Sequence, residues 1–196
     1  MKSAAIGLRI HSGWGTLVVV SNGGVLEIVD RRHIIIADPG ISGSKQPYHY
    51  AENLELKKAE EYIARCSTVS GQLASRAIRE VLSHLKRHEY RVQGSAILMA
   101  SERPLPSLEK ILASHALIHM AEGGFFRMLV RKACEDAGLT VTPLRERELE
   151  ERAKKTFGEK VNQIKERISS LGKRLGPPWT QDEKLATLSA ALIVVS

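Results

Sequence analysis

The sequence predicts an α/β protein with a mixed five-stranded sheet, in which three antiparallel strands are followed by αβ crossovers and flanked by helices. Short runs rich in β-branched residues, separated by Gly-containing turns, fill the first 37 residues. Two later apolar runs alternate with long segments of helical periodicity. Because a strand parallel to its neighbour needs a crossover connection, usually a helix, this alternation predicts parallel strands after the meander. A length of 196 residues is that of one domain, so we expect a single domain over residues 1–196.

Residues 1–37 are predicted to form a β-meander of three strands. AAIGLRI is the first strand, and the turn HSGWG leads into TLVVVSN, whose β-branched residues favour a second strand. NGG at 22–24 favours a hairpin, because Asn and Gly adopt positive φ at low cost. VLEIVDRRHIIIAD continues as the third strand. The glycines of HSGWG are also compatible with a phosphate-binding turn, but a plain hairpin turn is the simpler interpretation.

A helix is predicted over residues 51–88, after a loop at 38–50 in which Pro, Gly and Ser exclude regular structure. The STVSG segment at 67–71 is expected to kink or split this helix. Apolar residues recur at steps of three and four, as on one buried face of a helix. They are Leu56, Ala59, Ile63, Cys66, Leu73, Ala77, Val81 and Leu85.

The rest of the chain alternates strands and helices. RVQGSAILMAS is a predicted strand over 91–101. A second long helix is predicted over 107–137, with Gly138 suited to the left-handed conformation that follows a helix. LTVTPL, at 139–144, is the fifth strand, and residues 147–196 are predicted to be C-terminal helices, interrupted at GPPW.

The composition is that of a charged globular chain with a basic excess. Lys and Arg total 29 against 22 Asp and Glu, which gives a net charge of +7. Nucleic acid is a natural partner for such a chain, because Lys and Arg supply phosphate contacts. The alternative is an ordinary solvated surface, since charges of alternating sign dominate residues 142–176. An aromatic content of 5% gives little support to a base-stacking platform.

Several classes of protein are excluded. Two cysteines are too few for a disulfide framework, and Cys66 and Cys134 fall on or beside apolar helix stripes, as small core residues do. No apolar run is long enough to span a bilayer, and the first residues lack a signal-peptide pattern, so we expect no membrane partner and a cytoplasmic location. Neither a Walker motif nor a dinucleotide-binding motif is present.

One predicted helix carries an unusual set of ionisable residues. In HALIHMAE, residues His115, His119 and Glu122 fall on one face of the helix, within an apolar stripe. Two imidazoles and a carboxylate at this spacing can converge on one Zn, Mn or Fe ion. A functional polar pocket without a metal is a second interpretation. The third is a structural polar seam, in which Glu122 accepts a hydrogen bond from a His or from a backbone group.

The element order resembles the ribonuclease H-like superfamily, and within it the RuvC-type Holliday-junction resolvases. IGLRIHSGWGTLVV matches the opening strand, Gly-containing turn and second strand, and QDEKLATLSAAL matches the closing helix. The resemblance covers nearly the whole chain at the level of element order and implies a ribonuclease H-like fold. It also implies two divalent metals, Mg or Mn, held by carboxylates from the first strand, the fourth strand or its end, and the last helix. Here Arg9 stands where the first-strand Asp is expected, so the carboxylate set is incomplete.

The resemblance implies where the remaining site residues lie. Glu102 follows the fourth strand, at a strand end where open α/β sheets place ligands. Asp182 stands in the first turn of the last helix, although helix-dipole stabilisation beside the T-x-x-E capping box of TQDEKLAT also explains an acid there. We expect Glu102 and Asp182 to meet the face that carries His115, His119 and Glu122. The predicted catalytic residues are His119, Asp182 and Glu102, and the predicted metal ligands are Asp182, Glu122, His115 and His119.

Three functional hypotheses follow. The first is a ribonuclease H-like domain that associates with nucleic acid and lacks the standard two-metal nuclease site. The second is a metal-dependent nuclease or other phosphoryl-transfer enzyme with a rearranged site. The third is a non-enzymatic scaffold that self-associates through a helix face as a homo-oligomer. Fold analogy alone cannot choose among them.

Overall fold

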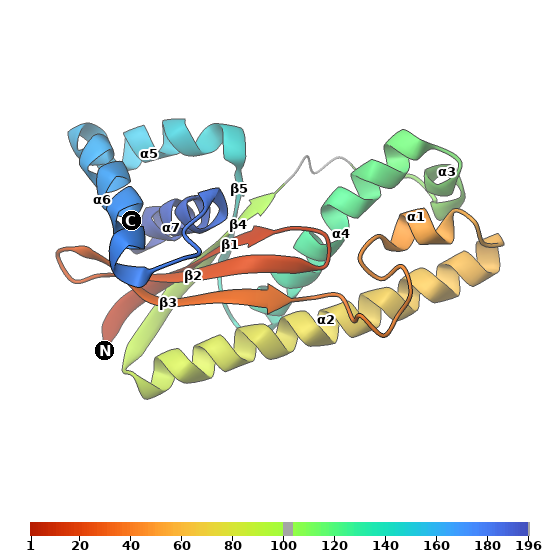
Figure 1. Cartoon of the computed structure of the whole chain (residues 1–196), viewed down its shortest axis with the longest axis horizontal. Coiled ribbons are helices and arrows are strands. Elements are labelled where there is room, and N and C mark those ends of the chain that lie inside the picture. Colours follow the sequence, from red (N-terminus) through yellow and green to blue (C-terminus); the bar gives the residue numbers. More distant parts are fainter. Residues whose placement is uncertain (100–103, 196) are drawn as a thin grey trace.

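The chain forms a mixed five-stranded sheet with helices on both faces (Figure 1). The computed structural model describes residues 1–99 and 104–195. In the strand order β3-β2-β1-β4-β5, the first three strands pair antiparallel, whereas β1 with β4 and β4 with β5 pair parallel. This confirms the predicted fold class. The strands are β1 (Lys2–Ile10), β2 (Trp14–Asn22), β3 (Leu26–Ile35), β4 (Tyr90–Met99) and β5 (Val141–Arg145).

The helices divide between the two faces of the sheet. In Figure 1, α2 runs along one face beside α4 and extends beyond the strands, where α1 and α3 lie against α2 and α4, while α5, α6 and α7 cover the opposite face. No helix in the described ranges is long and apolar enough to cross a membrane. The helices are α1 (Pro47–Ala51), α2 (Leu56–Arg87), α3 (Leu108–Leu112), α4 (His115–Asp136), α5 (Leu149–Phe157), α6 (Val161–Leu175) and α7 (Gln181–Val194), with short 3-10 turns at Glu146–Glu148 and Gly158–Lys160.

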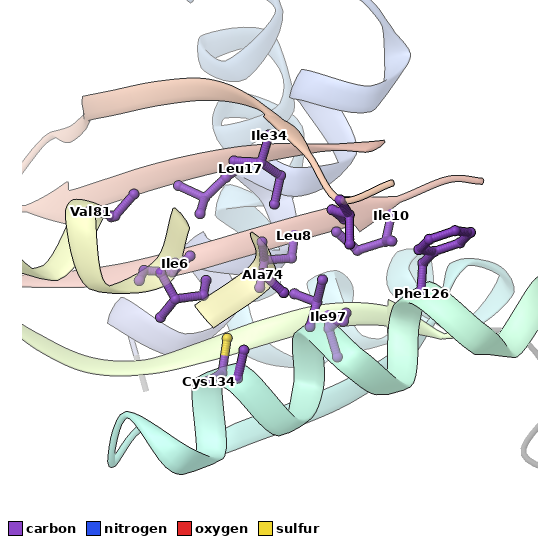
Figure 2. Close-up of a cluster of buried hydrophobic side chains, with 14 of the residues drawn as sticks. Ile6, Leu8, Ile10, Leu17, Ile34, Ala74, Val81, Ile97, Phe126 and Cys134 are labelled. Carbon is purple, nitrogen blue, oxygen red and sulfur yellow. The ribbon is translucent and has the colours of Figure 1, made fainter. Parts of the chain in front are cut away.

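Alternation along β1 builds a core on each face of the sheet. Ile6, Leu8 and Ile10 point toward α2 and α4, where Figure 2 shows them close to Phe126 and Cys134. The intervening side chains of β1 face α7, so the whole strand reads as a nearly continuous apolar run. Each fully buried Ile or Leu contributes about 1.5–3 kcal/mol through the apolar surface removed from water.

The predicted turns form as hairpins. Gly24 of the NGG sequence has φ of 101°, and Gly13 of the HSGWG turn has φ of 82°. The carbonyl of Gly13 accepts backbone N–H bonds from Ile36 and Ala37, at 2.8 and 2.9 Å, so this turn is tied to the end of β3. The interpretation of HSGWG as a hairpin turn is therefore confirmed.

Three local predictions were wrong. The segment 67–71 stays helical within α2, because its side chains continue the buried face of that helix instead of breaking it. The predicted helix at 107–137 is two helices, because the backbone of Ser114 is extended and starts a new helix at His115. A short helix, α1, occupies part of the predicted loop at 38–50, with Pro47 in its first turn, where a missing N–H costs nothing.

Candidate functional site

Helix α7 approaches β1 very closely at Gly7, and this approach positions the first group of polar residues. A Cβ atom at Gly7 would lie 1.8 Å from the carbonyl oxygen of Ala186, so only glycine permits the packing. The predicted capping box forms: the Thr180 hydroxyl accepts from the backbone N–H of Asp182, and the Glu183 carboxylate accepts from the N–H of Thr180 at 2.7 Å. The first turn of α7 is thereby fixed beside the carboxyl end of β1.

Asp182 lies there between two nitrogen donors. Its Oδ2 is 2.8 Å from Nε2 of His11, and its Oδ1 is 3.4 Å from Nε of Arg9. Arg9 also donates through Nη1 to the carboxylate of Glu146, which follows β5. The side chains of Arg9 and Asp182 are 21% and 20% exposed, so water screens these pairs only in part. We call Arg9, His11, Glu146 and Asp182 the β1–α7 cluster.

The β1–α7 cluster does not fit the two divalent metals that the resemblance implied. Both oxygens of Asp182 face nitrogen donors, and Arg9 stands where a first-strand carboxylate was expected. A guanidinium stays protonated in proteins, so it repels a metal ion at short range. Two Mg²⁺ ions need several carboxylate oxygens free to coordinate them. The predicted catalytic residue Glu102 lies outside the described residues.

Stacked rings hold His11 in its orientation. The His11 ring lies 4.4 Å from that of Trp14, with 18° between their planes, and Trp14 stacks in turn on His33 at 4.7 Å. The stack fixes the plane of the His11 ring, in which Nε2 lies 2.8 Å from Asp182.

A small cavity of about 130 Å³ lies beside His11. On its α4 side, burial lowers the pKa of Arg127, as does the nearby charge of Arg9, while Glu146 raises it. The Arg127 guanidinium donates to the carbonyl of Gly123 in the same helix. The lining residues are His11, Ser12, Glu122, Gly123, Phe126 and Arg127.

Glu122 turns away from solvent and toward helix α1. Its Oε1 accepts backbone N–H bonds from Tyr48 at 2.7 Å and His49 at 3.2 Å. Burial raises the pKa of the Glu122 carboxyl, and these hydrogen bonds oppose that effect. The interpretation of Glu122 as an acceptor for backbone groups is confirmed.

Three histidines gather on the solvent side of Glu122. His49, from α1, meets His115 and His119, from the first two turns of α4, and the candidate ligand nitrogens all lie within 4.8 Å of one another. His49 is partly buried, whereas His115 and His119 are exposed. The apolar stripe that carries His115 and His119 does not bury them: Ile118 and Ala121 in the same turns of α4 are buried, whereas the two histidines are exposed. We call His49, His115 and His119 the three-histidine cluster.

The predicted site residues thus fall into two groups. Asp182 joins Arg9 and His11, while His115 and His119 join His49. Glu122 contacts His49 and also lines the cavity that His11 lines. The sequence indicated Arg9 only as a replacement for an expected metal-binding Asp. It did not identify His11 or His49 as site residues.

The two missed histidines gave weak signals in the sequence. His49 stands alone in PYHY, within a segment predicted to be a loop, so no periodicity connects it to His115. His11 opens a turn, where a polar residue needs no special explanation. Only the docking of α1 on α4 and of α7 on β1 gives these side chains their partners.

Comparison with solved structures gives the fold a known counterpart. The structure of T. thermophilus RuvC in complex with a Holliday junction substrate matches 98% of this chain and 93% of that chain, with a TM-score of 0.55 at 12% sequence identity. A second Thermus thermophilus RuvC structure covers the same shares, with a TM-score of 0.50 at 14% identity. At these identities the likeness shows the fold, which is ribonuclease H-like. No family model and no curated protein matches the sequence.

Proposed function

We propose that this chain is a nucleic-acid-binding domain of ribonuclease H-like fold that does not cleave its ligand through a two-metal site. The observation that supports the absence of two-metal cleavage is the β1–α7 cluster, where Arg9 and His11 engage both oxygens of Asp182. An ion-paired carboxylate has little capacity left to bind Mg²⁺ or Mn²⁺. The groups in this cluster hold α7 against β1 instead of holding a metal.

The outer face of α2 supports the proposed binding of nucleic acid. Successive helical residues turn by 100°, so its seven basic side chains fall within an arc of about 120°, opposite the buried Ala74 and Val81. Glu61 is the acid within that arc. This basic face of α2 extends over about 45 Å at 1.5 Å per residue, which is longer than one turn of a DNA duplex. The basic side chains are Lys57, Lys58, Arg65, Arg76, Arg79, Lys86 and Arg87, all exposed.

The basic residues of the C-terminal helices differ, because acidic neighbours neutralise many of them. Glu150 pairs with both Lys154 and Lys165, and Glu148 pairs with Arg152. On the basic face of α2, by contrast, the one ion pair among the described residues joins Lys58 to Glu55, at 3.4 Å. Phosphates therefore meet fewer ion-paired basic side chains on the basic face of α2 than on α5 and α6.

Fold analogy adds a candidate ligand class. The RuvC structure that covers 98% of this chain holds a Holliday junction substrate, so branched DNA is the first ligand to test. Duplex DNA with the same sequence separates recognition of a branch from attraction to phosphate alone.

The test measures fluorescence anisotropy of a labelled four-way junction and its matched duplex between 50 and 200 mM salt. A double variant of the basic face, Arg76→Glu with Arg79→Glu, is compared with Lys154→Glu and Lys155→Glu on α5, which changes net charge equally. We expect wild-type affinity to fall linearly on a log–log plot against salt, and the α2 variant to bind ~10-fold more weakly than the α5 control. Circular dichroism spectra of both variants should match that of the wild type, which checks that they are folded.

Three outcomes would contradict the proposal. Absence of binding at 50 mM salt removes the nucleic-acid function. Equal losses in the α2 and α5 variants mean that net charge, and not the basic face of α2, attracts the ligand. Cleavage of the junction that requires Mg²⁺ or Mn²⁺ and is lost in Asp182→Ala restores the two-metal nuclease hypothesis.

A further inference from the structure

We infer that the three-histidine cluster is a binding site for one zinc-type divalent ion, with Glu122 holding His49 from behind. None of its residues belongs to the basic face of α2, so the inference does not rest on the proposed function. It also changes the predicted ligand set: His49 takes the position expected for Glu122, and Asp182 is not a ligand.

The positions of the three imidazoles suit one ion. Their candidate ligand nitrogens lie within 4.8 Å of one another, and nitrogens bound to one zinc at 2.0–2.1 Å are roughly 3.3 Å apart in a tetrahedral site. Bringing the three nitrogens to the separation found around one zinc ion therefore needs a movement of about 1.5 Å at most. His115 and His119 are one helical turn apart on α4 and exposed, so rotation of their side chains can supply it.

Glu122 places a carboxylate beside His49, and metal-bound histidines generally donate their second ring N–H to such a group. Its Oε1 lies 3.5 Å from Nδ1 of His49. Both His49 Nδ1 and Glu122 Oε2 are buried without a hydrogen-bond partner among the described residues. When Nε2 of a histidine binds a metal, Nδ1 must carry the proton, and here that N–H points toward a carboxylate. Metal binding at Nε2 would thus give the buried Nδ1 of His49 a hydrogen-bonding role that it lacks in the free protein.

The backbone around His49 is also fixed in advance. The same Glu122 oxygen accepts the N–H groups of Tyr48 and His49, so it ties α1 to α4 directly beneath the cluster. The Tyr48 ring packs edge-on against Phe125 of α4 at 5.9 Å. A ligand supported by a short helix and a buried carboxylate loses little conformational freedom on binding.

The donor atoms decide which ion fits. Three neutral imidazoles favour Zn²⁺ and its neighbours Co²⁺, Ni²⁺ and Cu²⁺, whereas Mg²⁺ and Mn²⁺ prefer oxygen ligands. Three protein ligands with an exposed side leave a fourth position for water, as in catalytic zinc sites. The ring contacts of 4.4 to 5.8 Å within the cluster are also compatible with edge-to-face packing alone, and the experiment must separate the two.

The experiment measures zinc binding to the intact, EDTA-treated chain by equilibrium dialysis, with competition against a chromophoric chelator for affinity. A Co²⁺ titration followed by visible absorption reports coordination geometry without any assay of activity. We expect one Zn²⁺ per chain, a tetrahedral Co²⁺ spectrum and no displacement by excess Mg²⁺. His49→Ala and His119→Ala should each weaken binding ~100-fold or more, and Glu122→Gln ~10–100-fold, because the amide still accepts the two N–H bonds but does not hold the imidazole N–H as strongly.

His84 and His88 provide a matched control. They are also four residues apart, at the C-terminal end of α2, with ring centroids 4.5 Å apart, but within the described ranges no third metal-ligating side chain joins them. The double variant His84→Ala and His88→Ala should leave zinc affinity unchanged. The inference is overturned if the wild type binds less than one ion, if the control loses as much affinity as His119→Ala, or if binding survives in His49→Ala and His119→Ala. Because His119 is exposed, its replacement should leave the fold intact, which the thermal midpoint without zinc verifies.

Discussion

The β1–α7 cluster and the three-histidine cluster have opposite electrostatic character, although Glu122 lies close to both. In the first, Asp182 and Glu146 form ion pairs with Arg9, and the second oxygen of Asp182 lies 2.8 Å from the His11 ring nitrogen, so these carboxylates have little left to offer a cation. In the second, three imidazoles face one another at the surface, and the carboxylate behind them is buried and only partly satisfied.

The difference teaches that position in a fold does not determine chemistry. The β1–α7 cluster lies where the fold resemblance placed metals, yet nitrogen atoms of Arg9 and His11 face both oxygens of Asp182 there. The three-histidine cluster lies on helices that extend beyond the sheet, yet its donors are those a transition metal prefers. Charge and donor type at each point are the stronger guide, and four predictions test this contrast.

The largest effect is expected at Gly7, which positions the first cluster. Gly7→Ala forces a methyl group against the Ala186 carbonyl, so α7 must move away from β1. We expect a loss of at least about 3 kcal/mol in the free energy of unfolding, measured by urea denaturation. Gly124→Ala is the control, because nothing lies within 4 Å of its added Cβ and Ala favours a helix. A loss in Gly7→Ala no larger than that of the control would mean that the close helix–strand contact is not structurally important.

The next effect separates structural from metal-binding roles for Asp182. Asp182→Asn removes the charge that Arg9 and His11 share, so we expect a loss of about 2 kcal/mol in the free energy of unfolding. Asp136→Asn, at an exposed pair with Lys132, should change it by less than about 0.5 kcal/mol. If Asp182→Asn proves neutral while abolishing Mg²⁺ binding, the carboxylate serves a metal and not the packing of α7.

A smaller effect tests whether Arg9 alone keeps metals out of the first cluster. Arg9→Asp should bring a new carboxylate beside Asp182 and Glu146, so Mn²⁺ should stabilise this variant by about 1 kcal/mol or more through mass action. The same Mn²⁺ concentration should leave the thermal midpoint of the wild type unchanged. Equal stabilisation of the two proteins would show that Arg9 does not exclude the ion.

The smallest effect is expected at the two cysteines, which belong to neither cluster. Both are free and buried, as the sequence predicted, and burial raises the pKa of Cys134 to about 11. A raised pKa means that the reactive thiolate is scarce at pH 8, so both thiols should react with Ellman's reagent only after unfolding. Zinc stoichiometry should be the same before and after exposure of the native protein to the reagent. Rapid native labelling with loss of zinc would move the metal site to a thiol.

Local patterns were sufficient to predict most of the framework. The β-branched runs, the NGG turn and the capping box at Thr180 each have a cause that acts over a few residues, and each formed. The predicted break at 67–71 did not form, because packing of α2 against α4 outweighed the weak helix preference of Ser, Thr and Val. The break at Ser114 was not predicted, because periodicity alone does not show where one helix stops and the next begins.

The sequence by itself determined the fold class, the order of the elements and the basic balance of the chain, because hydrophobic periodicity, turn residues and net charge are properties of the chain alone. The tertiary structure decided the partners. Asp182 pairs with His11, 171 positions away, through the close contact of α7 at Gly7, and His49 meets His119 because Glu122 ties α1 to α4. Such contacts depend on how helices dock, and the local pattern of either partner carries no trace of the other.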